Sequence, residues 1–325
     1  MIVPRYWAEG SAKHRIQGRQ TTVRRFGWSH SSLQDAQANA DGRAAEALRR
    51  ILAGEKLQPR EPKVPYNGAE GVPIREEIVA EHGDTIITRN SYGALCLNTP
   101  NVLFADVDFA PPSTVQAGCS LMFLLLVPAV WQAWNAGSFK VFIGLAVLSA
   151  IVGQLLAWAG QKLYLLLSGG PQKLASRRLL SFIKSHPGWR IRLYRTPAGL
   201  RALVMHRTFD PCETDVTTFF SALGTDPLYV KMCQRQHCFR ARVSPKPWRI
   251  GIASHMKPRP GIWPVRPEGL RERSEWLAVY DEKATAFAAC RFERELGDGA
   301  VNPLAQAVQR LHDQLSRSES DLPIA

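Results

Sequence analysis

AGCSLMFLLLVPAVWQAWN, residues 117–135, and VFIGLAVLSAIVGQLLAWAGQKLYLLL, residues 141–167, are two long apolar runs in the middle of the chain. Lys140 and Lys162 are the only charged residues from Ala117 to Leu167. A helix needs about 20 mostly apolar residues to cross the roughly 30 Å of hydrocarbon in a bilayer. Both runs meet this requirement, so the sequence predicts a transmembrane helical hairpin over 117–167.

The alternative interpretation of these runs is a buried helical hairpin in a large water-soluble core. Such helices normally carry polar residues along one face. Gln132, Gln154 and Gln161 are nearly the only strongly polar side chains inside the runs. The composition therefore favours the membrane interpretation.

The basic residues around the hairpin predict its orientation. The loop between the runs carries Lys140, whereas Lys173, Arg177 and Arg178 follow the second run. Cytoplasmic flanks of membrane helices carry the excess of Lys and Arg. We therefore expect an inner-membrane protein with both termini in the cytoplasm.

The rest of the chain predicts an α+β fold, a small mixed sheet with helices, which the inserted hairpin interrupts. We assign 1–60 to a basic N-terminal helical segment, 61–116 to the first half of a cytoplasmic α+β domain, and 168–325 to its second half. The expected strands are 84–88, 94–98, 101–109, 189–194, 198–206, 238–243 and 284–291. The expected helices are 33–53, 71–83, 175–186, 214–223, 270–280 and 303–316, and the last nine residues are expected to fray.

From Asn101 onward, and without the hairpin, these elements follow a βαββαβ order. The hairpin would then lie in the connection between a strand and its helix, where insertions are tolerated because connections run over the surface.

Positive charge is the main compositional feature outside the hairpin. The formal net charge is +13, which favours nucleic acid, nucleotides or the anionic inner leaflet as partners. Residues 227–267 contain no Asp or Glu and interleave Phe239, Trp248 and Trp263 with basic residues. The basic residues predicted to bind anions in this segment are Lys231, Arg235, Arg240, Arg242, Lys246 and Arg249.

The six cysteines are widely spaced, and we expect free thiols in a reducing compartment. Cys233, His237 and Cys238 form the one loose cluster, with His255 further along. A zinc site usually has paired ligands at two separated places, so the free-thiol interpretation is favoured here.

Asp106 and Asp108 lie near the end of the apolar strand 101–109. Residues two apart on a strand point to the same face, so the two carboxylates can hold Mg²⁺ or Mn²⁺, which prefer oxygen ligands. The alternative is a solvated strand end. No other cofactor is indicated.

The stretch RLYRTPAGLRALVMHR, residues 192–207, predicts a strand hairpin with cationic residues. Arg195, Arg201 and His206 are candidate contacts for a phosphate or carboxylate. The alternative, an edge hairpin with its cations in solvent, fits this composition better.

A strand ending in Asp-x-Asp, a helix, and a hairpin with Gly at its turn and His at its end resembles the core of archaeo-eukaryotic primase–polymerase enzymes. The resemblance implies that Asp106 and Asp108 bind catalytic metal and that His206 contacts nucleotide phosphate. The family's third acid has no clear match, with Asp210 and Asp226 as candidates, and a membrane hairpin in this connection is not expected of the family. As a whole, the chain looks more like an uncharacterised bacterial membrane protein family than like a recognisable enzyme.

Two functions follow from these features. The first is a non-enzymatic membrane-associated interaction module whose basic cytoplasmic face lies against lipid headgroups. The alternative is a membrane-tethered nucleotide- or nucleic-acid-binding protein with metal-dependent nucleotidyl or phosphoryl transfer at the acidic site. The sequence favours the first, because no complete catalytic constellation is visible, and leaves enzymatic activity open.

Overall fold

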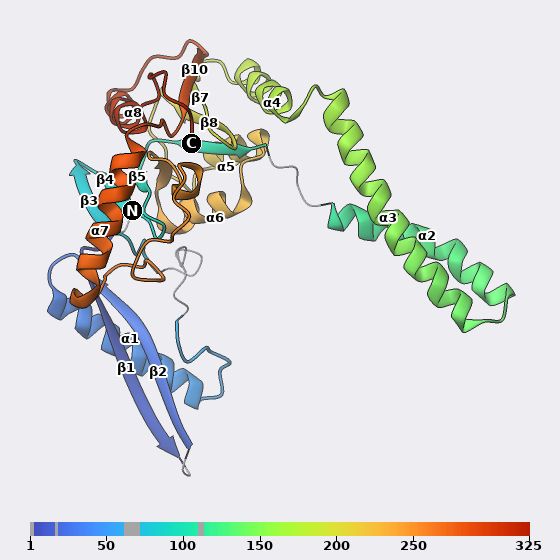
Figure 1. Ribbon diagram of the computed structural model, residues 1–325, viewed down its shortest axis with the longest axis horizontal. Coiled ribbons are helices and arrows are strands. Elements are labelled where there is room, and N and C mark those ends of the chain that lie inside the picture. The colour runs from blue at the N-terminus through green and yellow to red at the C-terminus, as the bar shows by residue number, and fades with distance from the viewer. Residues whose placement is uncertain (1–2, 17–18, 62–71, 110–113) are drawn as a thin grey trace.

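Two four-stranded antiparallel sheets form the centre of the molecule in the computed structural model, which describes residues 3–16, 19–61, 72–109 and 114–325 (Figure 1). The first sheet contains β6 (Phe104–Asp108), β7 (Ile191–Arg195), β8 (Gly199–Val204) and β10 (Arg291–Leu296), in the order β10-β7-β8-β6. The second contains β3 (Glu77–His82), β4 (Thr85–Arg89), β5 (Leu95–Thr99) and β9 (Phe239–Arg242), in the order β3-β4-β5-β9.

Each sheet combines strands that precede the two apolar helices in the chain with strands that follow them. β6 pairs with β8, and β5 pairs with β9. The mixed α+β character is confirmed, but the prediction of a small mixed sheet is wrong, because every pairing between the named strands is antiparallel. β9, which the βαββαβ order placed in one sheet with β6, β7 and β8, lies in the second sheet with β5.

The N-terminal segment is a long strand hairpin covered by one helix. β1 (Tyr6–Ile16) and β2 (Arg19–Ser29) pair along their length, and α1 (Leu33–Leu52) packs on them. Ser32 caps α1 by accepting a hydrogen bond from the Asp35 backbone N–H. A Cβ atom on Gly27 would lie 2.1 Å from the Ala40 backbone nitrogen, so only glycine permits this close packing.

The remaining helices surround the two sheets. They are α4 (Pro171–Ser185), α5 (Thr214–Leu223), α6 (Pro227–Gln236), the short 3₁₀ helix η2 (Pro247–Arg249), α7 (Pro267–Ala284) and α8 (Pro303–Ser316). Phe182 of α4 and Phe219 of α5 pack edge to face in the core, beside the buried strand residues Leu193 and Leu203. The burial of these large side chains supplies the main driving force for folding of this part.

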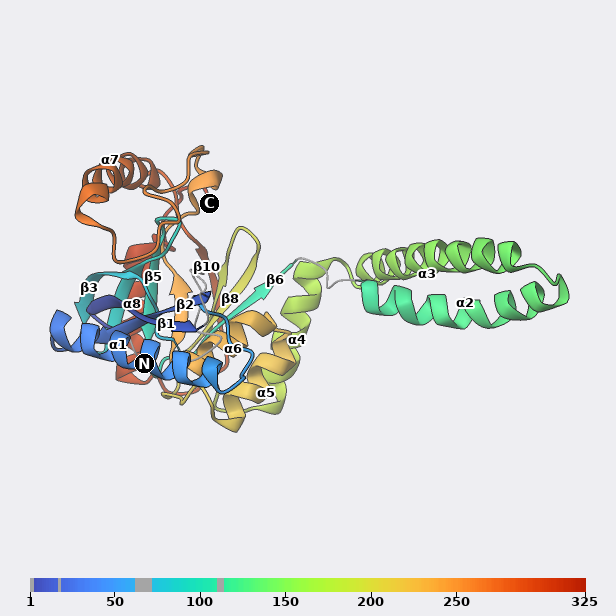
Figure 2. The same ribbon diagram turned by 90° about the horizontal axis from the view of Figure 1, so that it is seen from below.

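The two apolar runs form helices α2 (Val115–Asn135) and α3 (Phe139–Leu167), which lie side by side and extend away from the sheets (Figures 1 and 2). Both are long and apolar enough to cross a membrane. Gly118 and Gly153 face each other where the helices meet, because a Cβ on Gly153 would lie 2.9 Å from the Gly118 carbonyl oxygen. Away from this contact the helices expose large apolar side chains, such as Val127 and Leu166 at 71% and 76%.

Three expectations for the other elements are wrong. The segment 71–83, predicted as a helix, contains strand β3, which pairs with β4. The strand predicted at 284–291 is displaced, because α7 continues to Ala284 and β10 begins at Arg291. The C-terminus, expected to fray, is held in place, since Ala325 is 4% exposed and its backbone N–H donates to the Ala288 carbonyl oxygen.

Candidate functional site

A cavity of about 310 Å³ lies between the two four-stranded sheets. β6 and β8 line it from one sheet, and β5 and β9 line it from the other, with the N-terminus of α6 and the η2 helix completing the wall. The Tyr229 hydroxyl lies 3.0 Å from the carbonyl oxygens of both Phe104 and Arg240, and so joins β6 to β9. The size is within the range of small-ligand sites.

Three carboxylates form the acidic side of the cavity. Asp106 and Asp108 come from β6, and Asp226 caps the N-terminus of α6 by accepting a hydrogen bond from the Leu228 backbone N–H at 2.8 Å. Burial raises the pKa of Asp108 above its usual value, and the carboxylates of Asp106 and Asp226 raise it further. Neighbouring carboxylates repel one another in the absence of a cation, so this side of the cavity suits a divalent metal ion.

The pairing of β6 with β8 fixes how Asp106 is oriented. Asp106 lies opposite Arg201, whose Nε and Nη2 atoms donate to the two carboxylate oxygens at 2.7 and 2.9 Å. Arg201 is 2% exposed, and its other terminal nitrogen donates to the Arg242 carbonyl oxygen. Each carboxylate oxygen has a second lone pair, so Asp106 can still face the cavity while the buried guanidinium neutralises it.

Asp108 is placed by a close approach of the two strands. It lies opposite Gly199, where a Cβ atom would come within 1.9 Å of the Val107 carbonyl oxygen. Any larger residue at 199 would push the strands apart, so this glycine determines where the Asp108 carboxylate lies.

Arg242, Lys246 and Arg249 form the basic side of the cavity. Burial lowers the pKa of Lys246, and the guanidinium groups of Arg242 and Arg249 lower it further. One terminal nitrogen of Arg242 and one of Arg249 are buried without a hydrogen-bond partner among the described residues. Buried donors without partners cost free energy, and an anionic ligand would satisfy them.

The acidic and basic sides interact through the cavity without forming a contact. Asp108 and Lys246 each shift the pKa of the other. Within the described part of the chain, no ion pair of 4 Å or less joins Asp108 or Asp226 to Arg242, Lys246 or Arg249. The space between them can therefore accept a ligand that carries both a cation and anionic oxygens.

An aromatic residue lines the cavity, and a second one packs on the first. Tyr92 lines the cavity, and its ring packs edge to face on Trp248 with a centroid distance of 5.3 Å. Trp248 is 57% exposed, and the Lys246 ammonium lies over its ring. An exposed indole can stack on a base.

The structure brings together only part of the predicted site. Arg240 lines the cavity, but its guanidinium binds Glu76 at 2.7 Å, and both side chains are 5% exposed. Arg195 lies at the end of β7, with its guanidinium 4.6 Å from the Phe109 ring centroid. Lys231 and Arg235 are exposed on α6 and do not line the cavity.

His206, the phosphate contact implied by the primase–polymerase resemblance, lies away from the carboxylates. Gly199, at the start of β8, is the residue opposite Asp108, whereas His206 follows the other end of that strand. Its ring packs against Trp189 and Phe209, and burial lowers its pKa to about 4. A histidine in these surroundings is neutral near pH 7 and packs as part of the aromatic core.

Asp226 is the site residue whose role the sequence left undecided. It was one of two candidates for a third acid, and the structure places it in the cavity with Asp106 and Asp108. Asp210, the other candidate, does not line this cavity. The Asp-Pro pair at the start of α6 is a helix-start signal, but it does not reveal which strands the helix would face.

Comparisons with known proteins provide no further guide: no family model matches the chain, and neither a curated protein nor a solved structure is detectably similar to it.

Proposed function

We propose that the protein is anchored in a membrane by α2 and α3 and binds a phosphorylated small ligand of the nucleotide type together with a divalent cation. The observation that carries this proposal is the cavity in which Asp108 and Asp226 face Arg242, Lys246 and Arg249 without pairing with them, beside the Asp106–Arg201 ion pair. Carboxylates hold Mg²⁺ or Mn²⁺, and Lys and Arg bind phosphate oxygens.

The chemistry of such a ligand fits both sides of the cavity. Mg²⁺ is commonly bound by one or two carboxylates plus substrate phosphates, and it keeps several waters. Asp108 and Asp226 supply carboxylates, and Asp106 remains accessible through its second lone pairs. The phosphates would bridge the cation to Arg242, Lys246 and Arg249. The same carboxylates and cations would support metal-dependent nucleotidyl or phosphoryl transfer, but without His206, the phosphate contact that the resemblance to primase–polymerases implies.

The membrane part of the proposal rests on α2 and α3. Core helices of water-soluble proteins are mostly buried. Here only 17% of the residues in the most apolar 18-residue stretch of each helix are buried. An exposed apolar surface of this extent favours a lipid environment. The basic residues Lys173, Arg177 and Arg178 after α3 favour an orientation with both termini in the cytoplasm, at the inner membrane.

Titration with Mn²⁺ tests the acidic side of the cavity. Full-length protein in detergent or nanodiscs should reduce the EPR signal of free Mn²⁺, and Asp108→Asn should weaken this binding about 10-fold by removing an anionic ligand. Asp84→Asn is the matched control, because Asp84 is an exposed acid in the turn between β3 and β4. Equal binding by wild type and Asp108→Asn would remove the basis for the cation site.

A second candidate function is an interaction module that lies against anionic lipid headgroups. It is favoured by Lys231, Arg235, Arg259 and Arg266, which are exposed, and none of which forms an ion pair with another described residue. Each Lys or Arg near an anionic surface contributes about 1 kcal/mol. If this is the function, Lys231→Glu/Arg235→Glu should abolish binding to anionic vesicles, and Asp108→Asn should leave it unchanged.

A further inference from the structure

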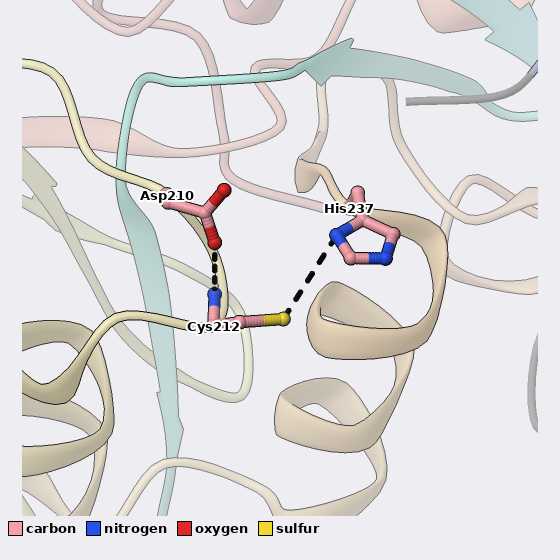
Figure 3. Close-up of side chains that lie close together, drawn as sticks. All are labelled: Asp210, Cys212 and His237. Carbon is pink, nitrogen blue, oxygen red and sulfur yellow. Dashed lines mark hydrogen bonds between the residues drawn. The ribbon is translucent and has the colours of Figure 1, made fainter.

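Asp210, Cys212 and His237 form a second cluster of polar side chains, distinct from the cavity between the sheets (Figure 3). All three residues are exposed, and their nearest ligand atoms lie within 4.8 Å of one another. The Cys212 side chain points at His237, with Sγ 3.9 Å from Nδ1. We propose that these three residues bind Zn²⁺, with the fourth position open to water.

The spacing of the donor atoms fits zinc. Zn–S and Zn–N bonds of about 2.3 and 2.05 Å at tetrahedral angles place sulfur and nitrogen about 3.6 Å apart. The Cys212–His237 distance of 3.9 Å needs only a small rotation of either side chain to reach this value. Thiolate and imidazole together select zinc over magnesium or calcium, which prefer oxygen ligands.

The backbone around each ligand is held in place. Asp210 and Cys212 flank the buried Pro211, and the preceding Phe209 is 3% exposed, with its backbone N–H donating to the Asn101 carbonyl oxygen at 2.8 Å. The Cys212 backbone N–H donates to Asp210 Oδ1 at 2.7 Å. The other carboxylate oxygen of Asp210 remains available for a metal ion.

His237 comes from a different element. It ends α6 in the left-handed conformation, with φ of 47°, and Cys238 after it is fully buried. This backbone turn directs the His237 ring toward the 210–212 loop (Figure 3). The cluster therefore joins α6 to the loop that precedes α5, and a bound ion would fix the two together.

From the sequence, His237 belongs only to the loose cluster with Cys233 and Cys238, which we interpreted as free thiols rather than as a zinc site. Cys233 and Cys238 are fully buried, whereas Cys212, which lies more than twenty positions earlier, reaches His237. The missing information is the tertiary packing of α6 against the loop before α5.

Cobalt substitution tests the site directly. We expect full-length protein in detergent, with excess Mg²⁺ present, to bind one Co²⁺ with a near-ultraviolet thiolate-to-metal charge-transfer band, which Zn²⁺ should bleach. Cys212→Ser should abolish the band. His237→Asn, which tolerates the left-handed backbone, should weaken Zn²⁺ binding about 100-fold, and Asp210→Asn about 10-fold.

The controls separate this site from other ligands in the chain. Cys119→Ser and His255→Ala remove another exposed cysteine and an exposed histidine, and each should retain the band. Asp108→Asn should retain it too, because the zinc site is independent of the proposed phosphate cavity. No charge-transfer band in the wild type, or an unchanged band in folded Cys212→Ser, would overturn the proposal.

Discussion

His206 illustrates how the surroundings of a single residue decide its role. Its ring lies 4.7 Å from that of Trp189, measured between centroids, and its Nδ1 atom is 3.5 Å from the Arg190 backbone nitrogen that donates to it. Accepting this hydrogen bond requires the neutral ring, and burial lowers the pKa of His206 to about 4. The folded state therefore disfavours the protonated form at pH values above about 4.

This lowered pKa predicts a loss of stability in mild acid. Between pH 6.5 and about pH 4 the unfolded chain binds a proton at His206 that the folded chain does not, so the free energy of unfolding falls as pH falls through this window. The contribution is on the order of 1 kcal/mol after allowing for solvent screening of a half-buried ring. The Tm of the wild type should therefore fall by about 2 °C more than the Tm of His206→Phe when the pH is lowered from 7 to 5. Parallel pH profiles of the two proteins would contradict this prediction.

The sequence could group residues of the candidate site only where they lie close to one another along the chain. Asp106 and Asp108 share a strand, and their alternation predicts that they share a face. The pairing of Asp106 with Arg201 and the approach of Asp226 depend on which strands and helices pack together. Local patterns do not encode such long-range register, because a shift by one residue would exchange the two faces of a strand.

At the scale of elements, strongly patterned segments were predicted correctly and ambiguous ones were not. Helix α5 at 214–223 and helix α8 at 303–316 lie where their periodicity placed them. The segment EIVAEH in 77–82 combines helix-forming Glu and Ala with β-branched Ile and Val, and pairing with β4 makes it a strand. Tertiary contacts decided this segment.

The membrane proposal requires that helices α2 and α3 lie in lipid. Wild-type protein expressed in bacteria should stay in the membrane pellet after alkaline carbonate extraction. Replacing 115–167 with a short polar linker should move the protein to the supernatant, because the linker removes both apolar helices.

A matched variant separates membrane insertion from helix packing. Gly153→Leu keeps the apolar length but places a side chain where the Met122 backbone nitrogen lies 2.8 Å from the Cβ position. This variant should remain in the pellet. Chemical cross-linking between α2 and α3 should be lost, because the two helices can no longer pack closely. Wild-type protein in the carbonate supernatant would contradict the membrane assignment.

At the scale of the whole molecule, the cavity lies close in sequence to the start of the apolar helices. Val115 begins α2, and Asp108 ends β6. The chain between them spans at most about 25 Å even when fully extended. If α2 and α3 are in lipid, the cavity therefore lies near the membrane surface, where the net charge of +13 also favours the anionic leaflet.

The two halves of the α+β part are separated in sequence by the apolar helices, but they fold together. β6 precedes the apolar helices and its partner β8 follows them (Figure 2). Both strands line the cavity. β6 and β8 pair although the apolar helices lie between them in the chain, so the sheet forms despite the interruption. The same pairing holds Asp106 opposite Arg201, which comes after the hairpin in the chain.

The most direct test is the equilibrium binding of ATP to the full-length protein in nanodiscs, with Mg²⁺ or with EDTA. We predict binding that EDTA weakens and that Lys246→Met reduces about 10-fold or more, because a hydrogen bond to a charged group contributes about 1.5–3 kcal/mol. Lys231→Met, on the exposed face of α6, is the matched control and should bind as wild type. ATP binding that is absent, or that is the same in EDTA and in Lys246→Met, would contradict the account.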